Sequence, residues 1–284
     1  MSTSDLKQLT FNRAALLKLA VILASLAVLY FRVVQSLAYD WIHASDFTPG
    51  FFVPIASLYF VYMKRKELSV LSPSSSWAGL VVLLFGIILF LLGNLATEYF
   101  TMRFSMLVVF GGIILFLLGK EFFKILLFPV IFLIFMIPLP SVLMDRITFP
   151  MQLLASKVAA NTLYVIGIPV LREGNVMLLA NTSLEVAEAC SGIRSLISLL
   201  GLSVLFAYLT QKVAWKRMVL ILSTFPIAII ANAARVAGTG ILAHHYGDSV
   251  AQGFFHGFSA YVLFAVTFGC LCLVESILSR IKNK

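Results

Sequence analysis

Long apolar runs recur along the whole chain and are separated by short polar segments. A helix that crosses a bilayer needs roughly 20 mainly apolar residues. The runs predict transmembrane helices at residues 14–34, 47–63, 77–94, 103–119, 122–138, 189–210, 217–243 and 254–279. Prolines fall inside the second and fifth of these spans (Pro54 and Pro129), where packing against neighbouring helices can accommodate them. The pattern therefore predicts an all-α integral membrane protein with about eight transmembrane helices.

The longest interruption, residues 139–188, lies between the fifth and sixth predicted spans. Its first half, 144–166, predicts a helix lying along the membrane interface, because apolar residues recur at helical spacing. These residues are Ile147, Met151, Leu154 and Val158. The second half contains Ile168-Pro-Val-Leu-Arg-Glu-Gly-Asn-Val-Met-Leu-Leu, which predicts two short strands around the Glu-Gly-Asn turn. We therefore expect one short β-hairpin in this loop.

Composition agrees with a membrane protein. The chain is 61% hydrophobic and 12% charged, whereas soluble domains are nearer half apolar and about a quarter charged. We find no hydrophilic stretch long enough for a second, soluble domain, so residues 1–284 are expected to form a single transmembrane domain. The three cysteines include no CxxC pair, and we expect neither a disulfide framework nor a metal or cofactor site.

The net charge of +9 is explained more simply by membrane topology than by nucleic-acid binding, because cytoplasmic loops of membrane proteins collect Lys and Arg. With eight spans, fourteen of the 21 Lys and Arg residues fall on one side of the membrane. They are Lys7, Arg13, Lys18, Lys64, Arg65, Lys66, Lys120, Lys124, Lys212, Lys216, Arg217, Arg280, Lys282 and Lys284. Eight of the twelve acids fall on the other: Asp40, Asp46, Glu98, Asp145, Glu173, Glu185, Glu188 and Asp248. Both termini are therefore expected in the cytoplasm, and the 139–188 loop outside it.

Three chemically active residues are predicted at the outer membrane surface. Arg235 lies eighteen residues beyond the cytoplasmic Arg217, about 27 Å along a helix. Cys190 lies 22 residues before a cytoplasmic lysine and His256 lies 24 residues before a cytoplasmic arginine, which corresponds to roughly 33–36 Å. Since the hydrocarbon core is about 30 Å thick, three different helices present Cys, Arg and His at one level.

Each of these residues also has a purely structural explanation. A lone membrane cysteine is usually a packing residue, which is our interpretation of Cys270 and Cys272. Cys190 instead opens a span, where the helix dipole and a nearby cation would lower the pKa of its thiol. Arg235 could simply extend to the interface, but Asn232 one turn earlier favours a polar pocket.

The small neighbours of Arg235 predict that this pocket is closely packed; they are Ala233, Ala234, Ala237, Gly238 and Gly240. His256 competes with His244 and His245, which we interpret as solvated loop histidines. Arg194 follows Cys190 by one turn and is a second candidate cation. A thiol, an acid–base histidine and an oxyanion-stabilising arginine together suit acyl transfer.

Three blocks of the sequence resemble the exosortase/archaeosortase family of membrane cysteine transpeptidases. The strongest is Val186-Ala-Glu-Ala-Cys-Ser-Gly-Ile-Arg-Ser195. The others are Asn232-Ala-Ala-Arg-Val-Ala-Gly-Thr-Gly240 and Phe255-His-Gly-Phe-Ser-Ala-Tyr-Val-Leu-Phe264. The resemblance is most specific from about residue 145 to 265 and includes Ile168-Pro-Val-Leu-Arg-Glu-Gly-Asn-Val; the first four spans match only in being hydrophobic.

The resemblance implies that Cys190, Arg235 and His256 are the catalytic residues. It further implies cleavage of a C-terminal sorting signal, typically a Pro-Glu-Pro-like motif followed by a transmembrane helix and a basic tail. The cleaved protein would pass to a lipid- or polysaccharide-linked acceptor outside the bacterial inner membrane, and many bacterial members accompany exopolysaccharide production. Supporting or substrate-binding residues are expected among Arg194, Asn232, Glu188, Ser191 and Gly192. The chain departs from the pattern at Gly257, where many bacterial members have Asp, and at Ala260, where glycine is common.

Two other classes of function compete with this hypothesis. Arg235 and His256 could line the path of a transporter, but such a protein should show repeated halves and charges near the midplane. The chain has no convincing repeat, and its polar groups cluster at one face. A non-catalytic assembly subunit of an exopolysaccharide export system would use the same surface for binding alone.

Overall fold

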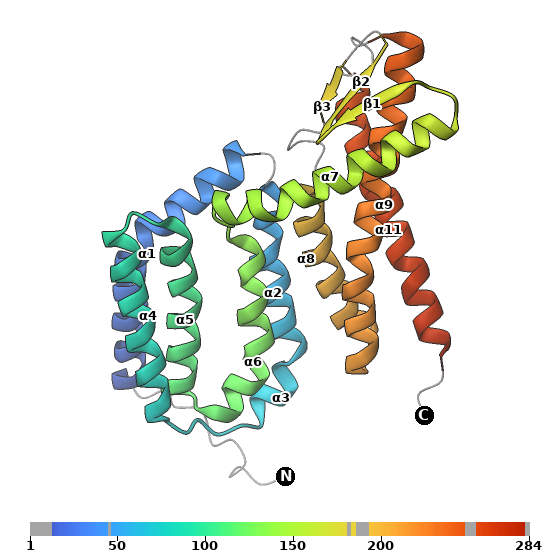
Figure 1. Cartoon of the computed structure of the whole chain (residues 1–284). Coiled ribbons are helices and arrows are strands. Elements are labelled where there is room, and N and C mark those ends of the chain that lie inside the picture. Colours follow the sequence, from blue (N-terminus) through green and yellow to red (C-terminus); the bar gives the residue numbers. More distant parts are fainter. Residues whose placement is uncertain (1–12, 45–46, 181–182, 186–192, 248–253, 282–284) are drawn as a thin grey trace. The chain divides into compact units, whose positions relative to one another are not determined.

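The computed structural model describes residues 13–44, 47–180, 183–185, 193–247 and 254–281 of the chain (Figure 1). These residues divide into two compact units, Met1–Ile137 and Pro138–Lys284. The first unit is helical throughout its described part. Its elements are α1 (Arg13–His43), η1 (Thr48–Phe51), α2 (Phe52–Met63), α3 (Arg65–Ser69), α4 (Trp77–Leu95), α5 (Tyr99–Leu117), α6 (Lys120–Phe132) and η2 (Leu133–Met136).

The second unit combines helices with a small sheet (Figure 1). Its helices are α7 (Ser141–Val165), α8 (Ile193–Thr210), α9 (Ala214–Tyr246) and α11 (Phe254–Arg280). Its strands are β1 (Val170–Glu173), β2 (Val176–Leu179) and β3 (Ser183–Glu185). They pair antiparallel in the order β1-β2-β3.

A helix lies within every predicted span, but fewer of the described helices are long and apolar enough to cross a membrane. Five described helices are long and apolar enough to cross, or six if Lys120–Met136 and Ser141–Val165 together make one. The five are Ala20–His43 within α1, α4, α5, α9 and Val262–Arg280 within α11. The second and sixth predicted spans contain shorter apolar helices, Pro49–Met63 and Leu196–Thr210.

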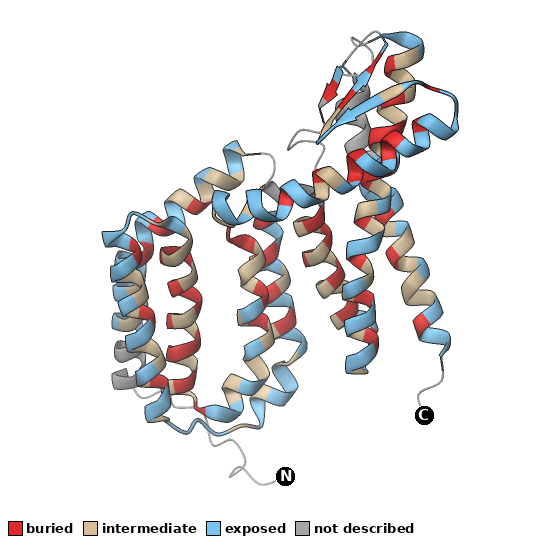
Figure 2. Cartoon of the chain, in the orientation of Figure 1, coloured by how far each residue is buried: buried red, intermediate tan, exposed pale blue. Residues whose placement is uncertain are grey.

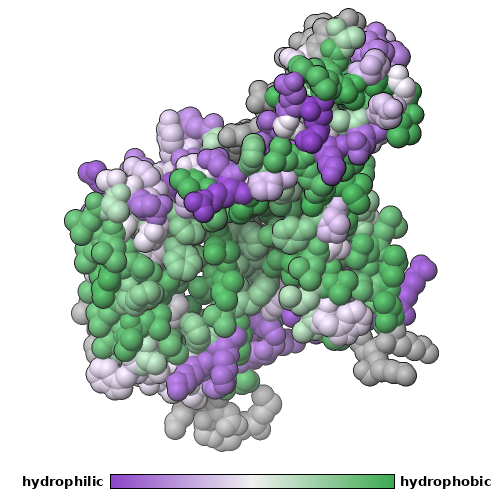
Figure 3. Space-filling view, viewed as in Figure 1, coloured by the Kyte–Doolittle hydropathy of each residue, from purple (hydrophilic) through white to green (hydrophobic). Residues whose placement is uncertain are grey.

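Large apolar side chains cover the outer faces of the helices. On α4, Val81 and Leu92 are 68% and 55% exposed, and the sides of the helices in both units are strongly hydrophobic (Figure 3). Hydrophilic residues gather at the helix ends instead. A protein surrounded by water rarely exposes contiguous apolar surface on this scale. The chain is therefore a multi-pass membrane protein.

Glycines allow α4 and α5 to pack in close contact. Gly79, Gly86 and Gly93 lie seven residues apart on α4 and are all buried. A Cβ at Gly86 would lie 2.7 Å from Cγ2 of Val109, and one at Gly79 would overlap the backbone of Phe116. Met102 and Val109, two of the buried residues along α5 (Figure 2), meet α4 at Gly93 and Gly86. Small residues that let helix backbones approach are a common basis of helix association in membranes.

Two prolines inside predicted spans, Pro54 and Pro129, are accommodated as expected. Pro54 lies in the first turn of α2, where its missing N–H costs little. Pro129 lies inside α6, and its carbonyl oxygen accepts a hydrogen bond of 2.8 Å from the hydroxyl of Ser57 on α2. A side chain of a neighbouring helix therefore stabilises the backbone at this proline.

The predicted helix and hairpin of the 139–188 loop are confirmed. α7 begins three residues before the predicted range of 144–166 and ends one residue before its end, and its place at a membrane interface stays a prediction. The hairpin turns at Gly174, whose φ of +64° suits glycine. Strand β3 was not predicted. Apolar residues of α7, the sheet and α9 form one buried cluster, here called the upper cluster. Its members are Ala155, Ala159, Ala160, Leu163, Ile168, Met177, Leu179, Leu184, Val236, Ala237 and Ala243.

Two predicted helix ends were wrong. α1 continues to His43, nine residues beyond the end of the first predicted span. α9 continues to Tyr246, so His244 and His245 lie in its last turn and not in a loop. His245 is exposed and His244 is half-buried. Both helices continue past their most apolar windows, which is why hydropathy alone placed the ends too early.

Candidate active site

α9 carries three polar residues on one face of its C-terminal half. Asn232, Arg235 and Thr239 are three and four positions apart, which places them on the same side of the helix. Asn232 is 2% exposed, and its Oδ1 accepts a hydrogen bond of 3.0 Å from Nη2 of Arg235. The hydroxyl of Thr239 donates to the backbone carbonyl of Arg235 at 3.0 Å. The half-buried Arg235 side chain is thus bound to its own helix.

The small residues around Arg235 divide into a packed side and an open side. Ala233 and Ala237 are buried, and a Cβ at Gly240 would lie 2.8 Å from Cδ1 of Leu163 on α7. Ala234 is exposed, and no described atom lies within 4 Å of a Cβ placed at Gly238. The predicted close packing is therefore confirmed on one side of the helix only.

Most of the other candidate residues fall outside the described part of the chain. Cys190, Glu188, Ser191 and Gly192 lie in the range 186–192, which the structure does not describe. Arg194 and His256 lie in the first turns of α8 and α11, and their side chains are not described. Both helices pack against α9 and against each other. The structure thus brings together the helices that carry the candidates, and at side-chain level it joins Asn232 with Arg235.

Chain connectivity limits how far Cys190 can lie from described residues. Cys190 follows Glu185 by five positions and precedes Ile193 by three. At 3.8 Å between consecutive Cα atoms, these separations cannot exceed about 19 Å and about 11 Å. Leu184 of β3 belongs to the upper cluster together with Val236, the residue after Arg235. The chain therefore enters the cysteine segment from a strand anchored in the same cluster as α9.

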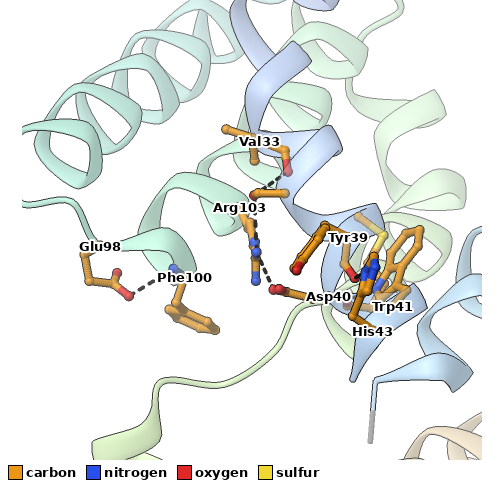
Figure 4. Close-up of polar contacts among 10 residues, drawn as sticks. Val33, Tyr39, Asp40, Trp41, His43, Glu98, Phe100 and Arg103 are labelled. Atoms are coloured by element: carbon orange, nitrogen blue, oxygen red, sulfur yellow. Dashed lines mark hydrogen bonds and ion pairs between the residues drawn. The ribbon is translucent and has the colours of Figure 1, made fainter. Parts of the chain in front are cut away.

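A second charged group, which was not predicted from the sequence, lies between α1 and α5 in the first unit (Figure 4). The Arg103 side chain is 5% exposed, and its Nη2 lies 2.6 Å from Oδ2 of Asp40. Nη2 also donates to the hydroxyl of Ser36 at 3.2 Å. The sequence contained one signal for this pair. Asp40 follows the end of the first predicted span and Arg103 begins the fourth, and an ionisable residue in a span needs a partner of opposite charge.

Glu98 caps the α5 helix beside this group. Its carboxylate accepts hydrogen bonds from the backbone N–H groups of Phe100 and Thr101 at 2.9 and 2.6 Å. Burial alone would raise the pKa of Glu98. Hydrogen bonds from Thr101 and Phe100 and the charge of Arg103 outweigh burial, so the pKa is lowered from its ordinary value of 4.5. Glu98 is therefore a carboxylate at neutral pH.

Comparison with known proteins identifies the family. The model of the transmembrane exosortase family matches residues 41–273, which is most of the chain and includes every candidate residue named for the site. The chain belongs to the transmembrane exosortase family. No curated protein and no solved structure matches it. In this exosortase the match also includes α2, α4 and α5, whose sequences resemble the family only in being hydrophobic.

Membership supports a membrane transpeptidase-type role for this exosortase. The group Asn232–Arg235 is chemically suited to such a role, since a guanidinium held in place by a neutral acceptor keeps its full positive charge. Among the described residues, no three His, Cys, Asp or Glu side chains are grouped as metal ligands.

Proposed function

We propose that this exosortase is a membrane-embedded cysteine transpeptidase with Cys190 as nucleophile, His256 as general acid and base, and Arg235 as the group that stabilises the oxyanion. The observation that carries the proposal is the family match over all three positions. It is supported by the packing of α8 and α11 against the helix that holds Arg235.

The proposed topology follows from the charge distribution. Eight spans with both termini in the cytoplasm put the lysine-rich and arginine-rich segments inside, in accordance with the positive-inside rule. The active site then faces the outside of the bacterial inner membrane. Arg235 lies about 27 Å along α9 from Arg217, close to the thickness of the hydrocarbon core.

In the first half of the reaction, His256 removes the proton of the Cys190 thiol, and the thiolate attacks the carbonyl carbon of the scissile peptide bond. The oxygen of the tetrahedral intermediate carries the negative charge, which Arg235 stabilises. When the C–N bond breaks, His256 returns the proton to the leaving amine, which departs with the transmembrane tail of the substrate. The exported part of the substrate remains on Cys190 as a thioester.

In the second half, an acceptor nucleophile attacks the thioester carbonyl and gives up its proton to His256. The C–S bond breaks, the substrate is transferred to the acceptor and the Cys190 thiol is regenerated. A lipid- or polysaccharide-linked group is the proposed acceptor, and water would give hydrolysis instead. The substrate is an exported protein with a Pro-Glu-Pro-like motif, an apolar helix and a basic tail at its C-terminus.

Asn232 is proposed as a positioning residue. Its amide oxygen accepts a hydrogen bond from Nη2 of Arg235. Because Asn232 is buried, its side chain keeps this oxygen in a fixed position. Arg194 is proposed as a second cation near the thiolate. Glu188, Ser191 and Gly192 are proposed to shape the segment around the nucleophile.

The experiment is a processing assay in cells that express this exosortase with an exported reporter carrying the proposed C-terminal signal. Cys190→Ala should reduce release of the shortened reporter by at least about 10³-fold, because the nucleophile of an acyl-transfer enzyme is lost. Cys270→Ala and Cys272→Ala are matched controls, since both cysteines are half-buried residues of α11, and both should retain processing. Full processing by Cys190→Ala would show that the proposed mechanism is wrong and would favour a non-catalytic assembly role.

A further inference from the structure

Helix α7 has an unusual distribution of polar and apolar residues. Polar side chains lie on its buried face, namely Thr148, Gln152 and Ser156, together with the buried Ala155 and Ala159. Large apolar side chains lie on its exposed face. A helix packed on a water-soluble protein normally has the opposite arrangement, with its apolar stripe towards the core. The exposed face of α7 therefore requires an apolar environment.

Exposed apolar residues recur on one side along the helix, with the exposed Asn161 as the polar position among them. Leu143, Ile147, Leu154, Val158 and Val165 follow one another at intervals of four and seven positions. Such intervals return a residue to the same side of an α-helix. The five side chains are between 40% and 84% exposed. They are called the α7 stripe below.

Both cations of α7 border this stripe on the same side. Arg146 precedes Ile147 by one position and Lys157 precedes Val158 by one, and both are exposed. Tyr164, which is 77% exposed, likewise precedes the stripe residue Val165 by one position and lies on the same border. The single acid of α7, Asp145, lies on the opposite side of the helix from the stripe. A basic border beside an apolar stripe is complementary to phosphate groups above acyl chains.

The contacts of α7 with α9 give an independent measure of its depth. Ala237 of the upper cluster, in which α7 and α9 meet, lies twenty residues beyond Arg217, or about 30 Å along α9. Gly240, in contact with Leu163 of α7, lies at about 35 Å. A hydrocarbon core is about 30 Å thick. In the second unit, α7 crosses α9 and does not run along it (Figure 1). Its level and direction are those of an interfacial helix.

We propose that the α7 stripe is inserted among the acyl chains of the outer leaflet and that Arg146 and Lys157 bind phospholipid phosphates. A lipid fits better than a protein partner because both cations lie on one border and the acid lies away from it. The proposal also corrects the lipid-facing surface expected from sequence: Met151 packs inward against the cluster formed by α8, α9 and α11. It does not depend on the proposed transpeptidase chemistry.

The lipid site has a structural consequence for the sheet. The hydroxyl of Ser156 on α7 donates to the backbone carbonyl of Gly174 at 2.9 Å, and Arg172 donates to the same oxygen at 2.7 Å. The hairpin turn is therefore fixed to the buried face of α7. Lipids that hold α7 at the interface would thereby set the height of the sheet, including β3, above the membrane.

The test uses the full-length protein in bilayers of phosphatidylglycerol and phosphatidylethanolamine, with the photoreactive residue p-benzoylphenylalanine placed on α7. Leu154 and Val158 are the stripe positions, and Asp145 is an exposed control on the other side of the same helix. After illumination, mass spectrometry should find phospholipid adducts at Leu154 and Val158 at several times the yield at Asp145. Equal lipid yields at all three positions, or cross-links from the stripe to this chain or a second copy, would overturn the proposal.

A second measurement tests the phosphate contacts. Arg146→Gln and Lys157→Gln together should reduce the number of phosphatidylglycerol molecules that remain bound to the protein in native mass spectrometry. Arg172→Gln is the matched control, because Arg172 is an exposed cation on the hairpin and outside the stripe. An equal loss of lipid in the control would contradict a site on α7. Neither measurement reads substrate processing, so the lipid site and the transpeptidase proposal can fail separately.

Discussion

At the scale of single residues, the proposed chemistry depends on how one arginine is held. Arg235 was expected from sequence, and the proximity of Asn232 followed from helical spacing alone. What the sequence could not provide is which contact the guanidinium makes, since a membrane arginine can equally extend to the interface. The hydrogen bond between Asn232 Oδ1 and Arg235 Nη2 answers this for the described residues.

Asn232→Ala should slow reporter processing by about 10- to 100-fold, because a hydrogen bond to a charged group is worth about 1.5–3 kcal/mol. Asn232→Asp keeps an acceptor oxygen and should retain more activity than the alanine variant. Thr239→Val is the control, as this hydroxyl bonds only the helix backbone among described partners. Equal activity of the alanine and aspartate variants, at unchanged thermal stability, would show that Asn232 does not position Arg235.

The ion pair between Asp40 and Arg103 could not be predicted locally, because its partners are 63 positions apart. Asp40→Asn should lower the free energy of unfolding by about 2–4 kcal/mol, since it leaves the buried Arg103 without a counter-charge. Glu67→Gln breaks the Lys64–Glu67 pair, which has the same 2.6 Å separation but is more exposed, and should cost less than about 1 kcal/mol. Thermal unfolding in detergent measures both, and equal losses would contradict a structural role for the buried pair.

The lowered pKa of Glu98 leads us to expect that the free energy of unfolding depends on pH. Its pKa is lowered in the folded protein, so its contribution is fully present above the ordinary pKa of 4.5 and is lost as pH falls through the folded value. Glu98→Gln should lose about 1 kcal/mol at pH 7, the usual value of a helix cap. The difference in melting temperature between the two proteins should narrow below about pH 4.5. A difference that stays constant into the acid range would show that the carboxylate charge is unimportant.

At the scale of elements, hydropathy located the long apolar helices but not the short polar α3, the helix ends or the smallest strand. α1 remains helical to His43 although its last turns contain charge, and Asp40 there pairs with Arg103 on α5. β3 is three residues long and exists through pairing with β2, a non-local contact that periodicity cannot reveal. The hairpin was predictable because its Glu-Gly-Asn turn is a local signal.

The contact between α4 and α5 gives a prediction at this scale. Gly79→Ala should strongly destabilise the first unit, because the added Cβ overlaps the backbone of Phe116 and forces the two helices apart. Gly269→Ala on α11 is the matched control, since no described atom lies within 4 Å of its Cβ. The control should be neutral or gain up to about 1 kcal/mol from helix propensity. Comparable stability of the two variants in thermal unfolding would contradict the close α4–α5 packing.

At the scale of the whole molecule, membrane character was predictable because apolar runs recur along the chain. The family was predictable because three local blocks within residues 186–264 resemble it. The number of spans is harder to predict from the sequence, since α2 and α6 have only 12 and 13 residues and fall short of the usual spanning length. The proposed topology makes a direct prediction. A membrane-impermeant thiol reagent should label Cys190 from outside intact cells, and labelling only after the cytoplasmic side is opened would contradict it.

The central claim, a thioester on Cys190, can be tested by isolating the intermediate. Purified exosortase incubated with the reporter in the absence of an acceptor should form a covalent complex that joins the exported part of the reporter to the enzyme. Hydroxylamine should cleave this complex, and mass spectrometry should place the bond on Cys190. Release of shortened reporter without any adduct on Cys190, or an undiminished adduct in Cys190→Ala, would contradict the account.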